Sequence, residues 1–440
     1  MAWVSDRHVH LNVNSNGLGR HQAGWQLSAR PREFLDLSAW EELARIAERG
    51  LLDAVFLADV LASSDFAKPW NAFDPFVPLV AAARVTSRVG LVATVSSTYR
   101  EPYDIARLAS SLDFASDGRA AVNIVTTMSP GAAAQYGRAA LPERDVRYGR
   151  AAETFTVIKQ LWDSWAPDAL VADPRTGTFV DESKVGTVDF HGEHIRLKAR
   201  FQFPRSPQGR PVVLQAGGSP QGIELAAEHA DAVFSAAHTL ASGQEFYRTL
   251  KARAAAYGRG PDEILVLPGL FIVLGSTEAE AKQRRAWLDG LTTAEDQLAG
   301  LHGLATRLDV PADSLELDKT LPWELIDRPD RTPRSVGFAN ATLTVAKEEN
   351  LTVRELLARD IVGHRTIVGT PEQVADSIEE WFTQGAADGF NVNFDVFPQG
   401  LEQIVDHLVP ELQRRGIYRT EYTGTTLREN LGLAEPARAT

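Results

Sequence analysis

Polar side chains occur where several apolar segments of the 440-residue chain end. Asp59 directly follows DAVFLA, Thr94 lies at the end of VGLVATV, and Asn123 falls late in AAVNIVT. Gly218 and Ser219 follow PVVLQA and open the next predicted helix. A Gly-Gly-Ser turn at a helix N-terminus offers free backbone N–H groups to a phosphate, although capping of the helix explains Ser219 equally well. Together these residues predict a small-molecule site at one end of a sheet.

The pair His8 and His10 raises the alternative of a metal site, because an H-x-H motif at the carboxyl end of a first barrel strand can bind a metal. Here the apolar strand continues beyond the pair, which places both histidines near its start. His191 and His194 lie in a predicted hairpin, away from any strand end. We therefore expect no metal, and interpret these histidines as packing or hydrogen-bonded side chains.

The elements that must position these residues repeat as an apolar strand followed by a helix. Several strands are continuous apolar runs, as expected when both faces are buried. Ser38 with Glu41 predicts a capping box, and Thr370 before Pro371 predicts a helix start. Eight such units predict an α/β fold, a single (β/α)8 TIM barrel over 1–440 with insertions at 165–210 and 275–370. The predicted strands are 8–14, 53–58, 89–95, 120–126, 211–216, 231–236, 264–274 and 390–396.

Composition and absent motifs narrow the function. The formal charge of −13 argues against nucleic-acid or membrane-surface binding, and no apolar run reaches the ~20 residues of a membrane helix. No secretory signal is evident, so we expect a cytoplasmic protein. Cysteine is absent, which excludes thiolate nucleophiles and iron–sulfur ligation. The chain has no G-x-G-x-x-G after a strand, P-loop, H-E-x-x-H or G-x-S-x-G motif.

Six collinear segments carry a family resemblance that runs from about residue 8 to residue 433 and includes both insertions. They are LLDAVFLADV (51–60), LVATVSSTYREPYDIARLASSLDFASDGRAAVNIVTT (91–127), RDVRYGRAAETF (144–155), FPRSPQGRPVVLQAGGSPQG (203–222), GAADGFNVNF (385–394) and YRTEYTGTTLRENLGL (418–433). The chain resembles the bacterial-luciferase-like flavin-dependent monooxygenases, in the branch of the nitrilotriacetate and dibenzothiophene-sulfone monooxygenases. The resemblance implies a luciferase-like barrel that binds reduced FMN (FMNH2), uses O2 through a C4a-(hydro)peroxyflavin, and inserts one oxygen atom into a small organic substrate.

The resemblance also implies partners and site residues. A separate NAD(P)H:FMN reductase supplies the flavin in such two-component systems, and a homo-oligomer, dimer or tetramer, is expected. Asp59 and Thr94 would lie beside the isoalloxazine and ribityl part of FMN, and Tyr148 and Ser219 at its phosphate. Arg144 stands where the family usually has histidine; it can bind phosphate but cannot titrate near neutrality. Asn123 and Gly218 complete the predicted cofactor site.

The substrate and the substrate-facing residues are less defined. The flavin carries the chemistry, so we assign no catalytic side chain and name four candidates near the site: His21, Tyr99, Arg100 and His238. Dense aromatic residues favour an aromatic or a sulfur- or nitrogen-containing heterocycle over a polyanion, since Arg100 is the one evident cation. These aromatics are Trp25, Phe66, Trp70, Phe73 and Phe76. Alternatives are a deazaflavin-dependent oxidoreductase of the same fold, a non-catalytic flavin-binding protein and, more distantly, a metal hydrolase. The long 275–370 insertion is interpreted as a lid that keeps water from the flavin.

Overall fold

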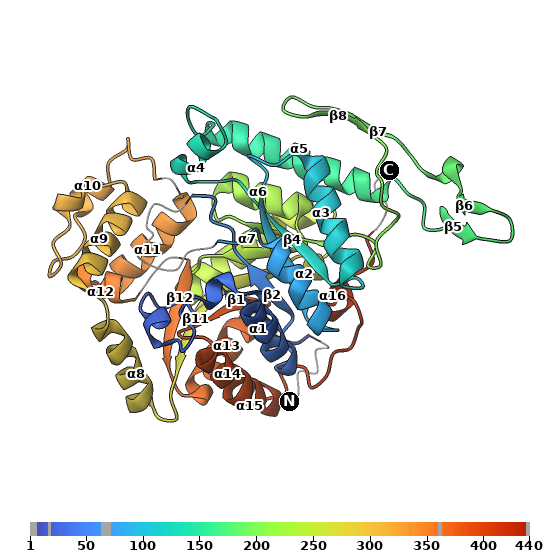
Figure 1. The fold of residues 1–440 in the computed structure, drawn as a ribbon. Helices are drawn as coiled ribbons and strands as arrows, with labels where there is room; N and C mark the ends of the chain where they lie inside the picture. Colours follow the sequence, from blue (N-terminus) through green and yellow to red (C-terminus); the bar gives the residue numbers. More distant parts are fainter. Residues whose placement is uncertain (1–6, 16–18, 63–71, 334, 360–362, 437–440) are drawn as a thin grey trace.

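A closed barrel of eight parallel strands forms the centre of the protein (Figure 1). The structure is a computed structural model and describes residues 7–15, 19–62, 72–333, 335–359 and 363–436. All eight predicted strands are confirmed, and pairing of the last with the first closes the ring. In barrel order they are β1 (His10–Ser15), β2 (Ala54–Leu57), β3 (Gly90–Ser96), β4 (Ala120–Val125), β9 (Val212–Ala216), β10 (Ala232–Ser235), β11 (Leu265–Leu274) and β13 (Gly389–Phe394).

Helices cover the outside of the barrel, and the main apolar core lies between them and the strands. Thr370 caps its helix as predicted, with its side chain accepting from the Gln373 N–H, whereas the cap of α1 is Asp36 and not Ser38. The Asp36 carboxylate accepts from the Ser38 N–H, so the helix is capped two residues before the predicted position. The covering helices are α1 (Leu37–Arg49), α2 (Phe76–Val85), α3 (Pro102–Ala115), α4 (Pro130–Gln135), α5 (Arg144–Asp163), α6 (Pro220–His229), α7 (Leu240–Ala256), α13 (Pro371–Thr383), α14 (Gln399–Gln403), the π-helical turn η6 (Ile404–Leu408) and α15 (Val409–Arg414). Short 3-10 turns are η1 (Gly24–Leu27), η2 (Glu33–Leu35), η3 (Glu182–Lys184), η4 (Pro261–Glu263) and η5 (Ala312–Ser314).

The inside of the barrel is apolar toward the amino ends of the strands and polar further along them. Phe56, Val92 and Leu214 belong to an inner apolar cluster that α16 (Leu427–Asn430) completes. Thr94 and Asn123 are the inward-facing residues one layer further on, since side chains alternate along a strand. The polar layer therefore faces the carboxyl end of the barrel, where barrel sites are built.

The two insertions leave the barrel as separate units. Residues 165–210 form two hairpins that extend beyond α3 and α5 in Figure 1, namely β5 (Leu170–Asp173) with β6 (Thr178–Val180) and β7 (Val188–His191) with β8 (Arg196–Ala199). The second hairpin confirms the one predicted from the sequence.

Residues 275–370 leave β11, the seventh barrel strand, and form a helical unit with an apolar cluster of its own. Its elements are α8 (Glu278–Gly290), α9 (Ala294–Leu308), α10 (Trp323–Ile326), α11 (Val336–Glu348), α12 (Val353–Ala358) and β12 (His364–Gly369). Strand β12, which the sequence analysis missed, pairs with the outer half of β11 and is largely half-buried. In the described ranges, no helix combines the length and apolar character needed to span a bilayer.

Candidate cofactor and substrate site

A pocket of about 120 Å³ opens at the carboxyl ends of β4, β9 and β10. It collects four of the residues predicted for cofactor binding: Arg144 and Tyr148 from the first turns of α5, and Gly218 and Ser219 from the loop before α6. Because α5 and α6 both begin here, their free N–H groups add partial positive charge to that of Arg144. We call this cavity the anion pocket.

The hydroxyl groups of Tyr148 and Ser219 are hydrogen-bonded to each other at 3.1 Å. Ser219 also caps α6, its Oγ accepting from the Gly222 N–H at 3.1 Å. The pair contains two hydroxyl hydrogens, and only one can lie between the two oxygens. The other hydrogen is available to an acceptor in the anion pocket.

Two arginines form one side of the anion pocket. Arg144 Nη2 donates to the backbone oxygen of Pro333 at 3.0 Å, which links α5 to the 275–370 insertion. Arg147, which the sequence analysis missed, is buried and donates through Nη1 to the Thr127 oxygen at 2.7 Å. Its position one turn after Arg144 on the same helix was the signal that could have indicated it.

The insertion itself supplies the opposite wall of the anion pocket, through residues 335–338. Ser335 caps α11 by accepting from the Phe338 N–H at 3.3 Å. Gly337 packs against Gly218 so closely that a Cβ on Gly337 would lie 3.3 Å from the Gly218 Cα. The anion pocket is therefore shared between the barrel and the insertion, which the sequence pattern did not reveal.

Inside the barrel mouth, Thr94 and Asn123 lie opposite each other on β3 and β4. The Asn123 Nδ2 donates to Thr94 Oγ1 at 3.1 Å, and both side chains are buried. Asn123 Oδ1 is buried with no hydrogen-bond partner within the described chain. The two side chains thus form one polar unit with an acceptor left for a ligand.

Asp59 lies after β2, half-buried, in a cluster with Asp74 and Arg100. Burial and the negative charge of Asp74 raise the pKa of Asp59 to about 6, against the opposing effect of Arg100. Arg100 itself forms an ion pair with Asp74. The candidate cation of the sequence analysis is therefore already neutralised by a neighbouring carboxylate.

The other candidate residues lie in different surroundings. His21 Nε2 is 3.0 Å from Asp289 Oδ1, and its Nδ1 accepts from the Ala23 N–H, so Nε2 carries the hydrogen. Tyr99 stacks on Tyr136 with ring centroids 4.5 Å apart, and its buried hydroxyl has no partner in the described ranges. His238 lines a separate, larger cavity.

The predicted aromatic wall is only partly described. Phe66 and Trp70 lie outside the described residues. Phe76 is buried in the main core as part of α2, so it packs the helix and does not face a ligand. Trp25 and Phe73 are half-buried.

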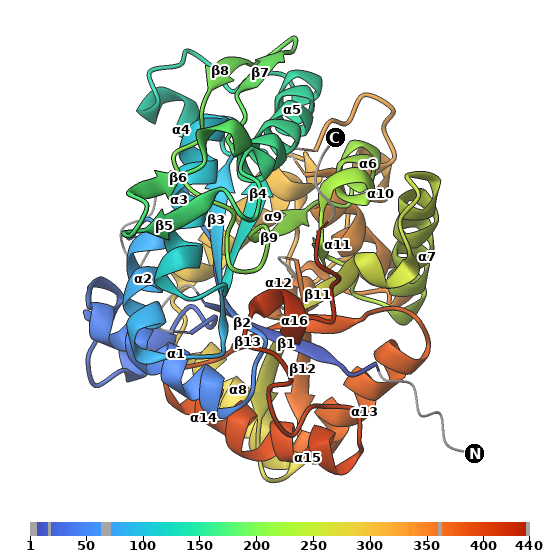
Figure 2. The same cartoon turned by 90° about the vertical axis from the view of Figure 1, so that its right-hand side faces the viewer.

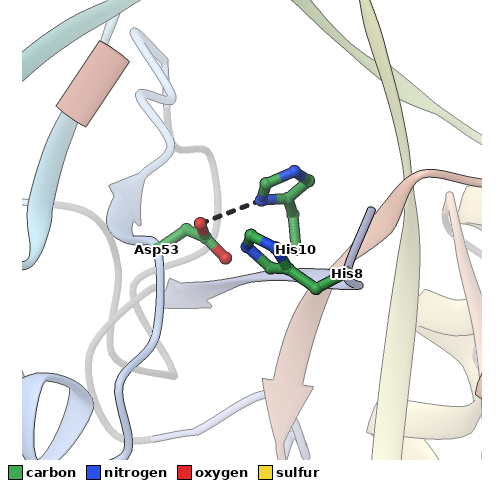
Figure 3. Close-up of side chains that lie close together, drawn as sticks. All are labelled: His8, His10 and Asp53. Atoms are coloured by element: carbon green, nitrogen blue, oxygen red, sulfur yellow. Dashed lines mark hydrogen bonds and ion pairs between the residues drawn. The ribbon is translucent and has the colours of Figure 1, made fainter. Parts of the chain in front are cut away.

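His8, His10 and Asp53 lie close together (Figure 3). They stand at the amino ends of β1 and β2, whereas the anion pocket lies at the carboxyl ends of the barrel strands. His10 Nδ1 is 3.0 Å from Asp53 Oδ1. Arg419 bonds to the same carboxylate and donates to His8 Nε2 at 2.9 Å. Burial, with His10 and Arg419 close by, lowers the pKa of His8 to about 4. The Arg419 guanidinium thus already supplies a positive charge to this cluster of two histidines and one carboxylate.

Comparisons with known proteins agree along nearly the whole chain. Residues 11–388 match the sequence profile described as luciferase-like monooxygenase. The chain is 40% identical to nitrilotriacetate monooxygenase component A of Aminobacter aminovorans, over 95% of each chain. It is 38% identical to a dibenzothiophene-sulfone monooxygenase of Rhodococcus erythropolis (strain XP), over 98% of each. Among solved structures, a riboflavin lyase with modified FMN and riboflavin superposes with a TM-score of 0.85 at 28% identity, covering 98% of this chain and 97% of the other.

Proposed function

The chain belongs to the luciferase-like monooxygenase family, and we propose on that premise that it is an FMNH2-dependent enzyme that inserts one atom of O2 into a small organic substrate. The observation that carries the proposal is the anion pocket. Arg144, the Tyr148–Ser219 hydroxyl pair and two long-helix N-termini converge there, which is the donor set that a phosphate monoester requires.

The residues present fit FMN along its length. Arg144, Tyr148, Gly218 and Ser219 would hold the phosphate, and the unpaired Asn123 oxygen would face the polar part of the flavin. Thr94 and Asp59 would lie beside the ribityl chain and the ring system. Bound reduced FMN would supply the activation of O2 and the transfer of one oxygen atom; the protein binds, orients and shields it.

The 275–370 insertion would serve as the cover of this site. It reaches the anion pocket through residues 335–338 and through the hydrogen bond from Arg144 to Pro333. Its own apolar cluster lets it act as one unit, and a cover excludes water that would divert the oxygen to hydrogen peroxide.

The relative's designation as component A supports a second component here as well. We propose a separate NAD(P)H:FMN reductase as the partner and a homo-oligomer as the working form. The substrate is expected to be a small organic molecule, with an aromatic or a sulfur- or nitrogen-containing heterocycle as the expectation from the sequence.

The test is a reconstitution with FMN, O2, NADH and a flavin reductase, in which candidate substrates are followed by mass spectrometry for the gain of one oxygen atom. Oxygenated product that depends on this chain supports the proposal. Failure of the purified protein to bind FMN in either redox state would overturn it.

A further inference from the structure

The 275–370 insertion contributes the start of a helix to the anion pocket. Four consecutive residues line the pocket there, namely the α11 N-cap Ser335 and the first three helical residues Val336, Gly337 and Phe338. Gly337 has no side chain, so it lines the pocket with its backbone. The pocket therefore lies against the N-terminal end of α11, where the N–H groups of the first turn point out of the helix.

One of these N–H groups is already satisfied within the chain. Ser335 Oγ accepts from the Phe338 N–H at 3.3 Å. The N–H groups of Val336 and Gly337 have no carbonyl oxygen one turn before them in the helix to which they could donate. These two donors are therefore directed at the pocket, and they carry the positive end of the dipole of a 13-residue helix.

Two guanidinium groups bring further positive charge to the pocket. Arg144 and Arg147 donate to backbone oxygens, and in the described ranges neither of them forms an ion pair with a carboxylate. The acidic residues on either side of Arg144 in the sequence, Glu143 and Asp145, are exposed and do not line the pocket. Arg147 is only 8% exposed. A buried cation whose partners are carbonyl groups is completed most favourably by an anion.

Among the described residues, three helices begin at this pocket: α5 and α6 from the barrel and α11 from the insertion. The insertion lies close to the barrel here, since a Cβ on Gly337 would be 3.3 Å from the Gly218 backbone nitrogen. Bringing three positive helix ends and two guanidinium groups together is electrostatically unfavourable when the pocket holds only water. An anion between them reverses the sign of this interaction, because every helix end and every guanidinium attracts it.

We propose that the first turn of α11 is part of the FMN phosphate site, and that the phosphate is the group that holds the insertion closed against the barrel. This inference rests on the proposed FMNH2-dependent function. The phosphate gains the N–H donors of Val336 and Gly337 only when the insertion is closed, so its binding favours the closed state by the free energy of those contacts. A flavin without a phosphate would enter the barrel but would leave the insertion unsupported.

The first test removes one donor without breaking the helix. Proline has no N–H, and its fixed φ suits the first position of a helix, so V336P deletes the Val336 donor while α11 can still begin there. Ser335 already has the extended conformation that a residue before proline requires, with φ −124° and ψ 105°. The controls are V336A, which keeps the N–H, and A294P, which makes the same change at the first position of α9, away from the anion pocket.

Binding of oxidised FMN and of riboflavin to each full-length protein is measured by flavin fluorescence. V336P should bind FMN at least about tenfold more weakly than the wild type, because a hydrogen bond to a charged group is lost, whereas V336A and A294P should bind it as the wild type does. Riboflavin affinity should be the same in all four proteins. Wild-type FMN affinity in V336P, or an equal loss in V336P and V336A, would overturn the proposal.

The second test needs no variant. Hydrogen–deuterium exchange of the wild type is followed in peptides from residues 294–358, with FMN or riboflavin bound to the same occupancy. FMN should slow exchange in the first turn of α11 and in the neighbouring helices of the insertion, and riboflavin should leave it unchanged. Equal protection by the two flavins would assign closure to the flavin ring and refute the role of the phosphate. If neither flavin binds, the proposed function fails instead, so the two failures are distinguishable.

Discussion

The hydroxyl pair of Tyr148 and Ser219 leads to a prediction about how single and double substitutions combine. The two oxygens share one hydrogen and leave one for a ligand. In S219A the Tyr148 hydroxyl still has a hydrogen to donate, and in Y148F the Ser219 hydroxyl has one. Either single variant can therefore keep the bond to the FMN phosphate, whereas the double variant cannot.

The magnitudes follow from the charge on the acceptor. A hydrogen bond to a charged group contributes about 1.5–3 kcal/mol, so the double variant should bind FMN about 10- to 150-fold more weakly. Each single variant should lose less than about 1 kcal/mol of binding free energy. The singles and the double are thus non-additive, as expected for groups that share a partner.

The assay is equilibrium FMN binding by flavin fluorescence, repeated with riboflavin, which lacks the phosphate. Riboflavin affinity should be unchanged in all variants. S219A also loses the cap of α6, which costs about 1 kcal/mol of folding stability, so T370A serves as the control that loses only the cap of α13. Wild-type FMN affinity in the double variant, or a full loss in either single one, would refute the shared-hydrogen argument.

Further predictions concern four other positions. Because the pKa of Asp59 is raised to about 6, ionisation of its carboxyl makes folding less favourable as pH rises from about 4 through 6. D59N should therefore be about 1–3 kcal/mol more stable than the wild type at pH 7–8 in chemical denaturation, and the two proteins should be nearly equal in stability near pH 4. R144A should weaken FMN binding by about 1.5–3 kcal/mol, and R144H should recover affinity as pH falls below about 6.5; equal affinity of wild type and R144A would place the phosphate elsewhere. G337V should push α11 away from the loop before α6 and so raise the hydrogen peroxide released per FMNH2 oxidised. The control is G303V on α9, where the added side chain meets open space. Equal peroxide release from the two variants would count against the 275–370 insertion as a cover of the flavin site. D53N should destabilise the fold by about 3–5 kcal/mol by leaving the Arg419 charge buried, while dialysis against a chelator leaves the melting temperature unchanged; a chelator-induced drop would revive the metal site.

The barrel could be predicted from the sequence because its strands are buried on both faces and therefore read as continuous apolar runs. The polar residues at the strand ends followed from the same pattern, since parallel strands bring their carboxyl ends together. The sequence pattern does not predict strand β12, because this strand is short, half-buried and paired only along the outer half of β11. The spacing of Ser38 to Glu41 predicts a cap at Ser38, but the helix begins earlier, and Asp36 caps it by accepting from the Ser38 N–H.

The sequence by itself determined the fold, the family and four residues of the anion pocket. The fold follows from the repeated pattern of apolar strands and helices, and the family and the four residues follow from the collinear segments that resemble it. Only the tertiary structure decided which charges are free. Arg100 pairs with Asp74, 26 residues away, whereas Arg365 meets Trp381 and no described carboxylate. The bond from Arg144 to Pro333 spans 189 positions of the chain. Pairing and burial depend on which distant segments pack together, and neither residue type nor spacing along the chain encodes that directly.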